Sequence, residues 1–160
     1  MTVRPIVDEN GVLQKMELED EAGRIITHGV RGARVEDFDS SLLTDVTIPE
    51  GVVAIGDSAC AGCDWIQSVC LPLGIITIGE RAFYDCYSLI EIALPEGVTS
   101  IAKEAFAECN QLERVTLPDG LLCIGERAFG WCESLTEIAI PKSVTSIAEN
   151  AFYGCSELQR

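Results

Sequence analysis

Five cysteines recur every 23 residues through the last two-thirds of the chain, and the residues around them recur in phase. These are Cys63, Cys86, Cys109, Cys132 and Cys155. Each lies near the middle of a unit that begins with proline, and the units start at residues 49, 72, 95, 118 and 141, the last being incomplete. A unit this short cannot enclose a hydrophobic core, so it must bury its apolar side against its neighbours. The sequence therefore predicts a solenoid in which repeated positions serve packing and variable positions are the candidates for function.

Eight positions of the unit are apolar in nearly every copy, and their order predicts the path of the chain. Isoleucine is invariant at the position of Ile101, and phenylalanine fills the position of Phe106 in every copy but the first, where Cys60 replaces it. Two apolar residues before each proline, such as Ile92 and Leu94, alternate like a half-buried strand. Proline and glycine then predict a tight turn and a second short extended piece, and the residues that follow predict one or two turns of helix.

The pattern L-P-x-x-V-T-S-I-x-x-x-A-F-x-x-C-x-x-L-x-x-I, which residues 95–117 match almost throughout, resembles the BspA-like leucine-rich repeat. The resemblance covers residues 43–160. It implies an α/β repeat solenoid: a leucine-rich-repeat-like, right-handed coil with a parallel concave sheet and short helices. Known members are mostly bacterial surface or secreted proteins, so the resemblance implies a non-catalytic protein–protein interaction scaffold with a role in adhesion or host binding.

The two ends of the chain differ from the repeat. Three short apolar runs at 3–7, 12–18 and 24–30 predict a β-meander, and Val35 and Phe38 are expected to close a short helix over the first coil. We therefore divide the chain into an N-terminal β cap, residues 1–42, and a solenoid, residues 43–160. The fifth unit stops without a cap, which predicts exposed core at that end. The alternative function is accordingly a structural or self-assembly module, a fragment of a longer repeat protein that self-associates through its uncapped C-terminal end.

The charge of the chain limits its partners. Its net charge is −15, and the excess of acids is spread along the whole length. A negative field repels phosphate backbones and anionic membranes, which argues against nucleic-acid binding and favours a neutral or basic protein partner. No apolar run is long enough for membrane insertion, and the N-terminal residues lack the layout of a secretory signal. As written, the chain is expected in the cytoplasm, whereas the family resemblance implies the cell surface or secretion.

Catalytic and metal chemistry find little support in the sequence. Cys60 and Cys63 form a C-x-x-C, but both occupy core positions and no second pair or nearby histidine completes a metal set. We predict buried, reduced thiols, with a redox or metal role for this pair as the alternative. The single histidine, His28, has no catalytic motif around it. We expect no enzymatic activity, no cofactor and no metal.

The variable positions supply the candidate site. All five tryptophan and tyrosine residues avoid the core positions, and they are predicted to lie on the rim between the short helix and the concave strand, where such residues anchor protein interfaces. They are Trp65, Tyr84, Tyr87, Trp131 and Tyr153. A second candidate set faces outward from the concave strand: Glu91, Arg114, Thr116 and Glu137. The alternative is that each aromatic ring only covers its own turn.

Overall fold

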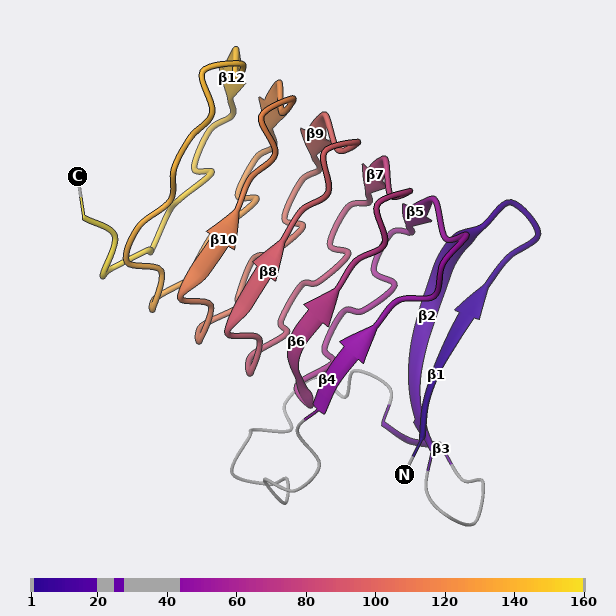
Figure 1. The fold of residues 1–160 in the computed structure, drawn as a ribbon. Coiled ribbons are helices and arrows are strands. Elements are labelled where there is room, and N and C mark those ends of the chain that lie inside the picture. Colours follow the sequence, from indigo (N-terminus) through magenta and orange to yellow (C-terminus); the bar gives the residue numbers. More distant parts are fainter. Residues whose placement is uncertain (1, 20–24, 28–43, 160) are drawn as a thin grey trace.

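The chain folds as a stack of coils, and two sheets run along the stack (Figure 1). The computed structural model describes residues 2–19, 25–27 and 44–159. Successive coils correspond to the predicted units, and we number them 1 to 5 from the prolines at 49, 72, 95, 118 and 141. The predicted solenoid with parallel strands is therefore confirmed.

The first sheet, which we call the front sheet, contains one strand from each of four successive turns of the chain. Its strands are β4 (Thr44–Thr47), β6 (Ile66–Cys70), β8 (Glu91–Ala93) and β10 (Arg114–Thr116). All are parallel, and a bridge between Arg114 and Glu137 continues the pairing into the next turn of the chain. Since side chains alternate along a strand, Ile92 points into the core while Glu91 and Ala93 face outward.

The second sheet is built from the short extended piece that follows each proline turn. Its strands are β5 (Ala54–Ile55), β7 (Thr77–Ile78), β9 (Ser100–Ile101), β11 (Cys123–Ile124) and β12 (Ser146–Ile147). They pair in parallel with equivalent residues opposite each other, so that Ile101 lies between Ile78 and Ile124. The invariant isoleucine of the repeat is thus a continuous column of core.

The N-terminal strands extend the second sheet. Strands β1 (Thr2–Val7), β2 (Val12–Glu19) and β3 (Ile25–Thr27) are antiparallel neighbours and overlap the three predicted apolar runs. Strand β2 also pairs in parallel with β5, which places Leu13 opposite Ile55 and buries Leu13 and Met16 over coil 1. The expected helix near Val35 and Phe38 lies outside the described residues, and the division at residue 42 stays a prediction.

The third side of each coil is not helical, so the predicted short helices are wrong for the described residues. Every second backbone N–H group on this side donates a hydrogen bond to the next coil. Phe83 N donates to Ala105 O and Asp85 N donates to Ala107 O, both at 2.8 Å, whereas Tyr84 N donates to a carbonyl of its own coil. Left-handed backbone at two positions per coil, with φ of 56° at Arg81 and 57° at Asp85, interrupts any helix. The described residues accordingly contain no helix with the length and apolar character that a membrane span requires.

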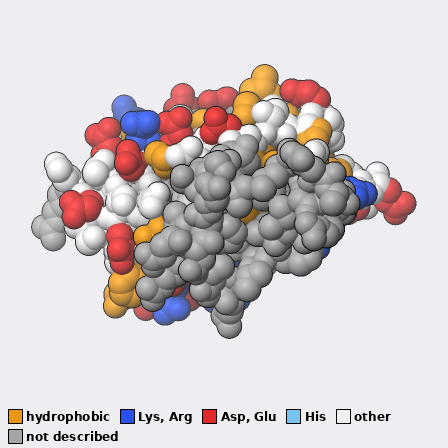
Figure 2. Space-filling model, turned by 90° about the horizontal axis from the view of Figure 1, so that it is seen from below, with side chains coloured by type: hydrophobic (Ala, Val, Ile, Leu, Met, Phe, Trp, Pro, Cys, Tyr) orange, Lys and Arg blue, Asp and Glu red, His pale blue; other side chains and the backbone are white. Residues whose placement is uncertain are grey.

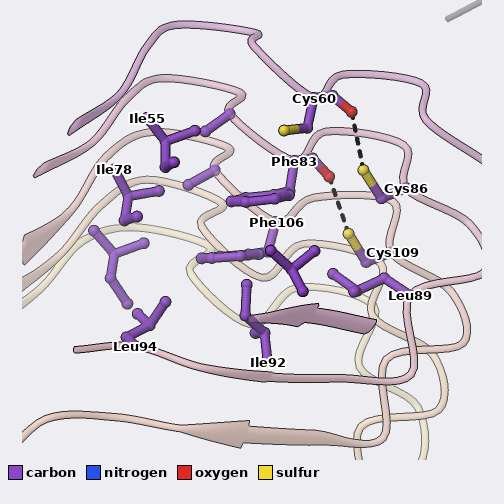
Figure 3. Close-up of a cluster of buried hydrophobic side chains, with 14 of the residues drawn as sticks. Ile55, Cys60, Ile78, Phe83, Cys86, Leu89, Ile92, Leu94, Phe106 and Cys109 are labelled. Atoms are coloured by element: carbon purple, nitrogen blue, oxygen red, sulfur yellow. Dashed lines mark hydrogen bonds between the residues drawn. The ribbon is translucent and has the colours of Figure 1, made fainter. Parts of the chain in front are cut away.

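The core repeats with the coils, as Figure 3 shows for its central part. The phenylalanine rings form a continuous stack whose neighbouring centroids lie 5.3–5.4 Å apart, within 6° of parallel; they belong to Phe83, Phe106, Phe129 and Phe152. The thiol of Cys86 donates to Cys60 O at 3.0 Å, and that of Cys109 donates to Phe83 O at 3.1 Å. The predicted ladder of buried, unpaired thiols is confirmed for the inner coils, and Cys155 in coil 5 is half-buried.

Candidate functional site

Each coil turns a corner between its third side and the front sheet, at the lower edge of Figure 1. The corner comprises the four-residue segments 61–64, 84–87, 107–110, 130–133 and 153–156, and we call their combined exterior the corner surface. Backbone hydrogen bonds join the segments directly: Glu108 N donates to Gly130 O at 2.8 Å, and Trp131 N to Tyr153 O at 2.6 Å. Equivalent residues of successive coils are therefore neighbours along this surface.

Four of the five predicted aromatic residues lie on the corner surface. Tyr87, Trp131 and Tyr153 are 39%, 43% and 55% exposed, and Tyr84 is half-buried. The rings of Trp131 and Tyr153 meet edge to face, with centroids 5.2 Å apart and planes at 86°. The exposed aromatic area is thus shared between coil 2 and coils 4 and 5.

Trp65 is the exception, and its predicted exposure is wrong. Its side chain is only 1% exposed and belongs to the core. Ser88, at the same position of coil 2, is also buried, whereas Gln111 in coil 3 is exposed. The position faces inward near the N-terminal end of the stack and outward further along, a difference that a comparison of repeats cannot reveal.

The backbone at Trp131 is left-handed, with φ at 62°. Coils 1 and 5 have Gly62 and Gly154 at this position, and both glycines also have positive φ. A bulky residue in this conformation is an outlier that the surrounding structure must hold. The ring of Trp131 lies against coil 5, because a Cβ built on Gly154 would be only 2.6 Å from its Cε3 atom. The presence of glycine in two copies was the only sequence signal of this geometry.

Negative charge gathers on the corner surface. The five corner segments contain four acids, Asp64, Asp85, Glu108 and Glu133, and neither lysine nor arginine. Burial raises the pKa of Glu108, and the neighbouring carboxylates of Asp85 and Glu133 raise it further. Figure 2, which views the molecule from below, shows acidic side chains along the visible rim of this side, together with a few basic ones. The surface therefore presents carboxylates that repel one another.

Arg81 reaches toward this surface from the third side of coil 2. The guanidinium of Arg81 lies over the Tyr84 ring, 5.2 Å from its centroid, and its Nε donates to Glu104 Oε2 at 2.6 Å. Glu104 is largely buried, and its hydrogen bond to Arg81 raises the pKa of the guanidinium. The cation is therefore held between an aromatic face and a carboxylate of the next coil.

Asp64 is a buried carboxyl that sequence reasoning missed. It is 6% exposed, and its Oδ1 has no hydrogen-bond partner among the described residues. Burial and the charge of Asp85 raise its pKa to about 7, although the backbone N–H of Tyr87 lowers it in part. The other copies have exposed or half-buried residues at this position, so nothing in the repeat pattern marked Asp64.

The second predicted set lies together on the outward face of the front sheet. Arg114 Nη2 donates to Glu91 Oε2 at 2.7 Å, and both side chains are more than half exposed. Two shallow depressions flank Arg114: Thr116 borders both of them, Glu91 lies beside one and Glu137 beside the other. The structure thus brings these four residues together, on a different face from the aromatic residues of the corner surface.

The cysteines offer no obvious reactive centre in the described part of the chain. Cys60 and Cys63 are buried, and burial raises the pKa of each thiol well above its usual value. Cys70 and Cys123 are exposed. No three potential ligands among the described residues are placed to hold a metal ion. His28 lies outside the described residues.

Comparison with known proteins places the chain among bacterial repeat proteins. Residues 34–159 match the model of the BspA type leucine rich repeat region in six copies, one more than the five units that begin with proline. Among solved structures, the leucine rich repeat protein of T. pallidum is 35% identical with a TM-score of 0.70, covering 73% of this chain and 57% of its own. A leucine rich cell surface protein from Faecalibacterium prausnitzii A2-165 is 32% identical with a TM-score of 0.72, covering 90% and 36%.

A leucine-rich repeat protein from Bacteroides ovatus ATCC 8483 is 29% identical with a TM-score of 0.72, covering 99% of this chain and 38% of its own. This chain therefore corresponds to 57% of the length of the T. pallidum protein and to less than 40% of the length of each of the other two. No curated protein matches it.

Proposed function

The chain belongs to the BspA-type leucine-rich repeat family, and from this premise we propose that it is a non-catalytic scaffold that binds another protein through its corner surface. One observation carries the proposal: Tyr84, Tyr87, Trp131 and Tyr153 lie on one surface outside the core, while phenylalanine alone fills the aromatic column inside it. Exposed aromatic rings contribute little to the packing of the core, so these residues are candidates for binding. Tyrosine and tryptophan supply large contact area with little loss of conformational entropy, which is why they anchor interfaces.

The charge of the protein defines the class of partner. A net charge of −15 favours association with a neutral or basic protein surface and opposes binding to nucleic acid. One of the solved relatives is described as a cell surface protein. Adhesion or host binding is the corresponding role that we propose for this chain, and it requires only that the corner surface be accessible to the partner.

The outward face of the front sheet is a second contact area for the same partner. Arg114, itself a residue type enriched in interface hot spots, separates two shallow depressions that Glu91, Thr116 and Glu137 help to line. Thr116 and Ala93 are small, so the strands leave room for an opposing side chain beside the guanidinium.

Coil 3 supplies the residues for a test that preserves the fold. It has Ala107, Glu108 and Asn110 at the positions of Tyr84, Trp131 and Tyr87. The triple substitution Tyr84→Ala, Tyr87→Asn and Trp131→Glu therefore introduces residues that this backbone already accepts, including a glutamate at positive φ.

Immobilised wild-type protein and the triple variant are compared by quantitative pull-down from extracts of the producing cells and of candidate host cells. We expect proteins retained by the wild type to be lost at least tenfold with the variant, because interface anchors typically contribute 2 kcal/mol or more, roughly a thirtyfold change in affinity. A front-face control, Glu91→Gln with Arg114→Gln, should reduce retention less. Equal retention by wild type and triple variant, with both folded by circular dichroism, would remove the corner surface from the proposal.

Self-association through the last coil is the second candidate function. Ile147 is 49% exposed and Phe152 and Leu158 are half-buried, whereas Ile101, Phe106 and Leu112 of coil 3 are at most 2% exposed. Sedimentation velocity over a hundredfold range of concentration separates the candidates. A scaffold for another protein should sediment as a monomer at every concentration. A self-assembly module should form larger species as the concentration rises, and Ile147→Ser should restore the monomer.

A further inference from the structure

We propose that the corner surface binds a proline-rich segment of its partner in the polyproline II conformation, and that prolines one helical turn apart contact the rings of coil 2 and coil 4. This inference rests on the proposed function and names the chemistry of the partner. It is drawn from the spacing of the exposed rings, from the coil between them and from the hydrogen bonds of the corner backbone.

The aromatic rings of the corner surface form two groups, separated by one coil. Coil 2 carries Tyr84 and Tyr87, and the edge-to-face pair of Trp131 and Tyr153 belongs to coils 4 and 5. In coil 3, the side chains of the corner segment 107–110 are either buried or half-buried. A peptide that crosses the surface therefore meets a ring, then a less prominent coil, and then a second ring.

The spacing of the two groups matches one turn of a polyproline II helix. Stacked strands lie about 4.8 Å apart, so the backbone of coil 4 lies roughly 10 Å from that of coil 2. A polyproline II helix has about three residues per turn and a rise of about 3.1 Å per residue, so residues i and i+3 lie about 9.3 Å apart on one side. Prolines at these two positions can contact Tyr87 of coil 2 and Trp131 of coil 4 at the same time.

The backbone of the corner surface is already paired between coils, which argues against addition of a partner strand. Asp85 N donates to Ala107 O at 2.8 Å, and Trp131 N donates to Tyr153 O at 2.6 Å. A peptide that binds as an added strand needs an exposed sheet edge with free backbone groups. Recognition at this surface therefore depends on side chains.

The side chains present are those that recognise proline-rich segments. The large hydrophobic residues that the five corner segments expose are all aromatic: Tyr87, Trp131 and Tyr153. An amphipathic helix binds in a hydrophobic groove that receives its apolar face, whereas proline-rich segments bind to surfaces lined by aromatic rings. The composition of the corner surface thus favours a polyproline II segment over a helix.

The rings also offer hydrogen-bond donors that suit a polyproline II backbone. Trp131 Nε1 and the hydroxyl group of Tyr153 make no hydrogen bond within the described part of the chain. A polyproline II helix has no internal hydrogen bonds, so its carbonyl groups are free to accept from such donors. Aromatic side chains with a polar end can therefore contact both the proline rings and the carbonyl groups.

Trp131 is held in position before a peptide binds. Its indole ring lies against Gly154, and it meets the ring of Tyr153 with centroids 5.2 Å apart. A proline-rich segment is also ordered in advance, because each proline ring restricts its own φ angle. Binding between two such partners loses little conformational entropy, which allows a small contact area to suffice.

The test measures binding of a fluorescently labelled, end-blocked deca-proline by anisotropy at about 150 mM salt, where long-range electrostatic effects are largely screened. A glycine–serine peptide of equal length is the matched probe, because it is also neutral but flexible. We expect the wild type to bind deca-proline at least about tenfold more tightly than the flexible peptide. Trp131→Gly, which copies Gly62 and Gly154 at positive φ, should weaken binding of deca-proline about tenfold.

A second variant tests the spacing while the number of rings stays the same. Glu108→Trp combined with Trp131→Gly moves the tryptophan from coil 4 to coil 3, only about 4.8 Å from coil 2. The new indole has a glycine beside it, as Trp131 has Gly154, and both substituted positions have positive φ. Because the probe is neutral, the loss of one carboxylate should have little effect, and we expect binding as weak as that of Trp131→Gly.

Three outcomes would overturn the inference: deca-proline binds no more tightly than the glycine–serine peptide, Trp131→Gly binds it as the wild type does, or the variant with the displaced tryptophan binds it as the wild type does. If a tryptophan variant fails to fold by circular dichroism, Tyr87→Asn, which copies Asn110, removes a ring of coil 2 and should weaken binding about tenfold. An unchanged affinity in Tyr87→Asn would refute the inference equally.

The pull-down with the triple aromatic variant judges the proposed function separately. If that variant loses its partner while an excess of deca-proline fails to displace the partner from the wild type, the corner surface is a binding site and only the proline-rich character of the partner is refuted.

Discussion

Removing one ring from the middle of the phenylalanine stack tests the packing most severely. Phe106 is fully buried, and its ring stacks on Phe83 at 5.3 Å and on Phe129 at 5.4 Å. Phe106→Ala leaves a cavity, which for a buried phenylalanine costs about 3–5 kcal/mol. It also removes two ring contacts worth about 0.5–1.5 kcal/mol each beyond burial, so we expect a loss near the upper end, about 5 kcal/mol.

The last ring of the stack is the matched control. Phe152 is only half-buried and has one stacked neighbour, Phe129, so Phe152→Ala should cost about 2 kcal/mol. Urea unfolding followed by circular dichroism measures both free energies, and the fluorescence of the buried Trp65 shows whether coil 1 unfolds in the same transition. Losses that are equal for the two variants, or below about 2 kcal/mol for Phe106→Ala, would contradict a continuous stack.

Three further predictions concern individual positions. Because the folded pKa of Asp64 is raised from 3.8 to about 7, its contribution to stability is complete below pH 4 and is lost as the pH rises to 7. Asp64→Asn should remove this loss and increase the unfolding free energy at pH 8 by up to about 4 kcal/mol, with little change at pH 4; equal shifts at both pH values would argue against a titrating buried carboxyl. Gly154→Ala should lower stability by about 1–3 kcal/mol and alter Trp131 fluorescence, because φ is +78° and the new Cβ meets the indole ring. Gly130→Ala, at negative φ with its nearest contact at 3.3 Å, is its control and should cost less. Cys109→Ser should cost about 1–3 kcal/mol because it buries a hydroxyl in place of the thiol that bonds to Phe83 O, whereas exposed Cys70→Ser should be near neutral in the same urea titrations.

The repeat predicted the packing of this protein well, because each core residue meets its own equivalents in the neighbouring coils. Ile101 pairs with Ile78 and Ile124, and Phe106 stacks between Phe83 and Phe129, so one alignment of the sequence with itself fixes both columns.

The prediction of short helices failed because helix propensity is a local property, whereas backbone N–H groups of these residues donate hydrogen bonds to the next coil. Residues 80–83 are good or moderate helix formers, yet Arg81 has a left-handed backbone and donates its N–H to Lys103 O. The same hydrogen bonds recur between each pair of neighbouring coils, and together they outweigh the local preference of these residues for helix.

The candidate site was predicted in part, and its errors have a physical cause. Comparison of repeats identifies residues that packing does not require, which located Tyr84, Tyr87, Trp131 and Tyr153 on the surface. It assumes that all coils share one environment, and for that reason it misplaced Trp65 and missed Asp64, both of which are buried in coil 1. The acidic character of the corner surface emerged only when the coils were stacked, since its carboxylates lie more than 20 residues apart in sequence.

Site-specific photocrosslinking tests the central claim, that the corner surface contacts the partner, most directly. A benzoylphenylalanine in place of Tyr153, which is 55% exposed on the corner surface, is compared with one in place of Ile76, which is 58% exposed just before β7 on another side of the coil. Both probes have equal access to solvent, so a difference in crosslinking reports the position of the partner. We predict a crosslinked product with the bound protein at Tyr153 and none at Ile76, whereas crosslinking at Ile76 alone, or equally at both positions, would contradict the account.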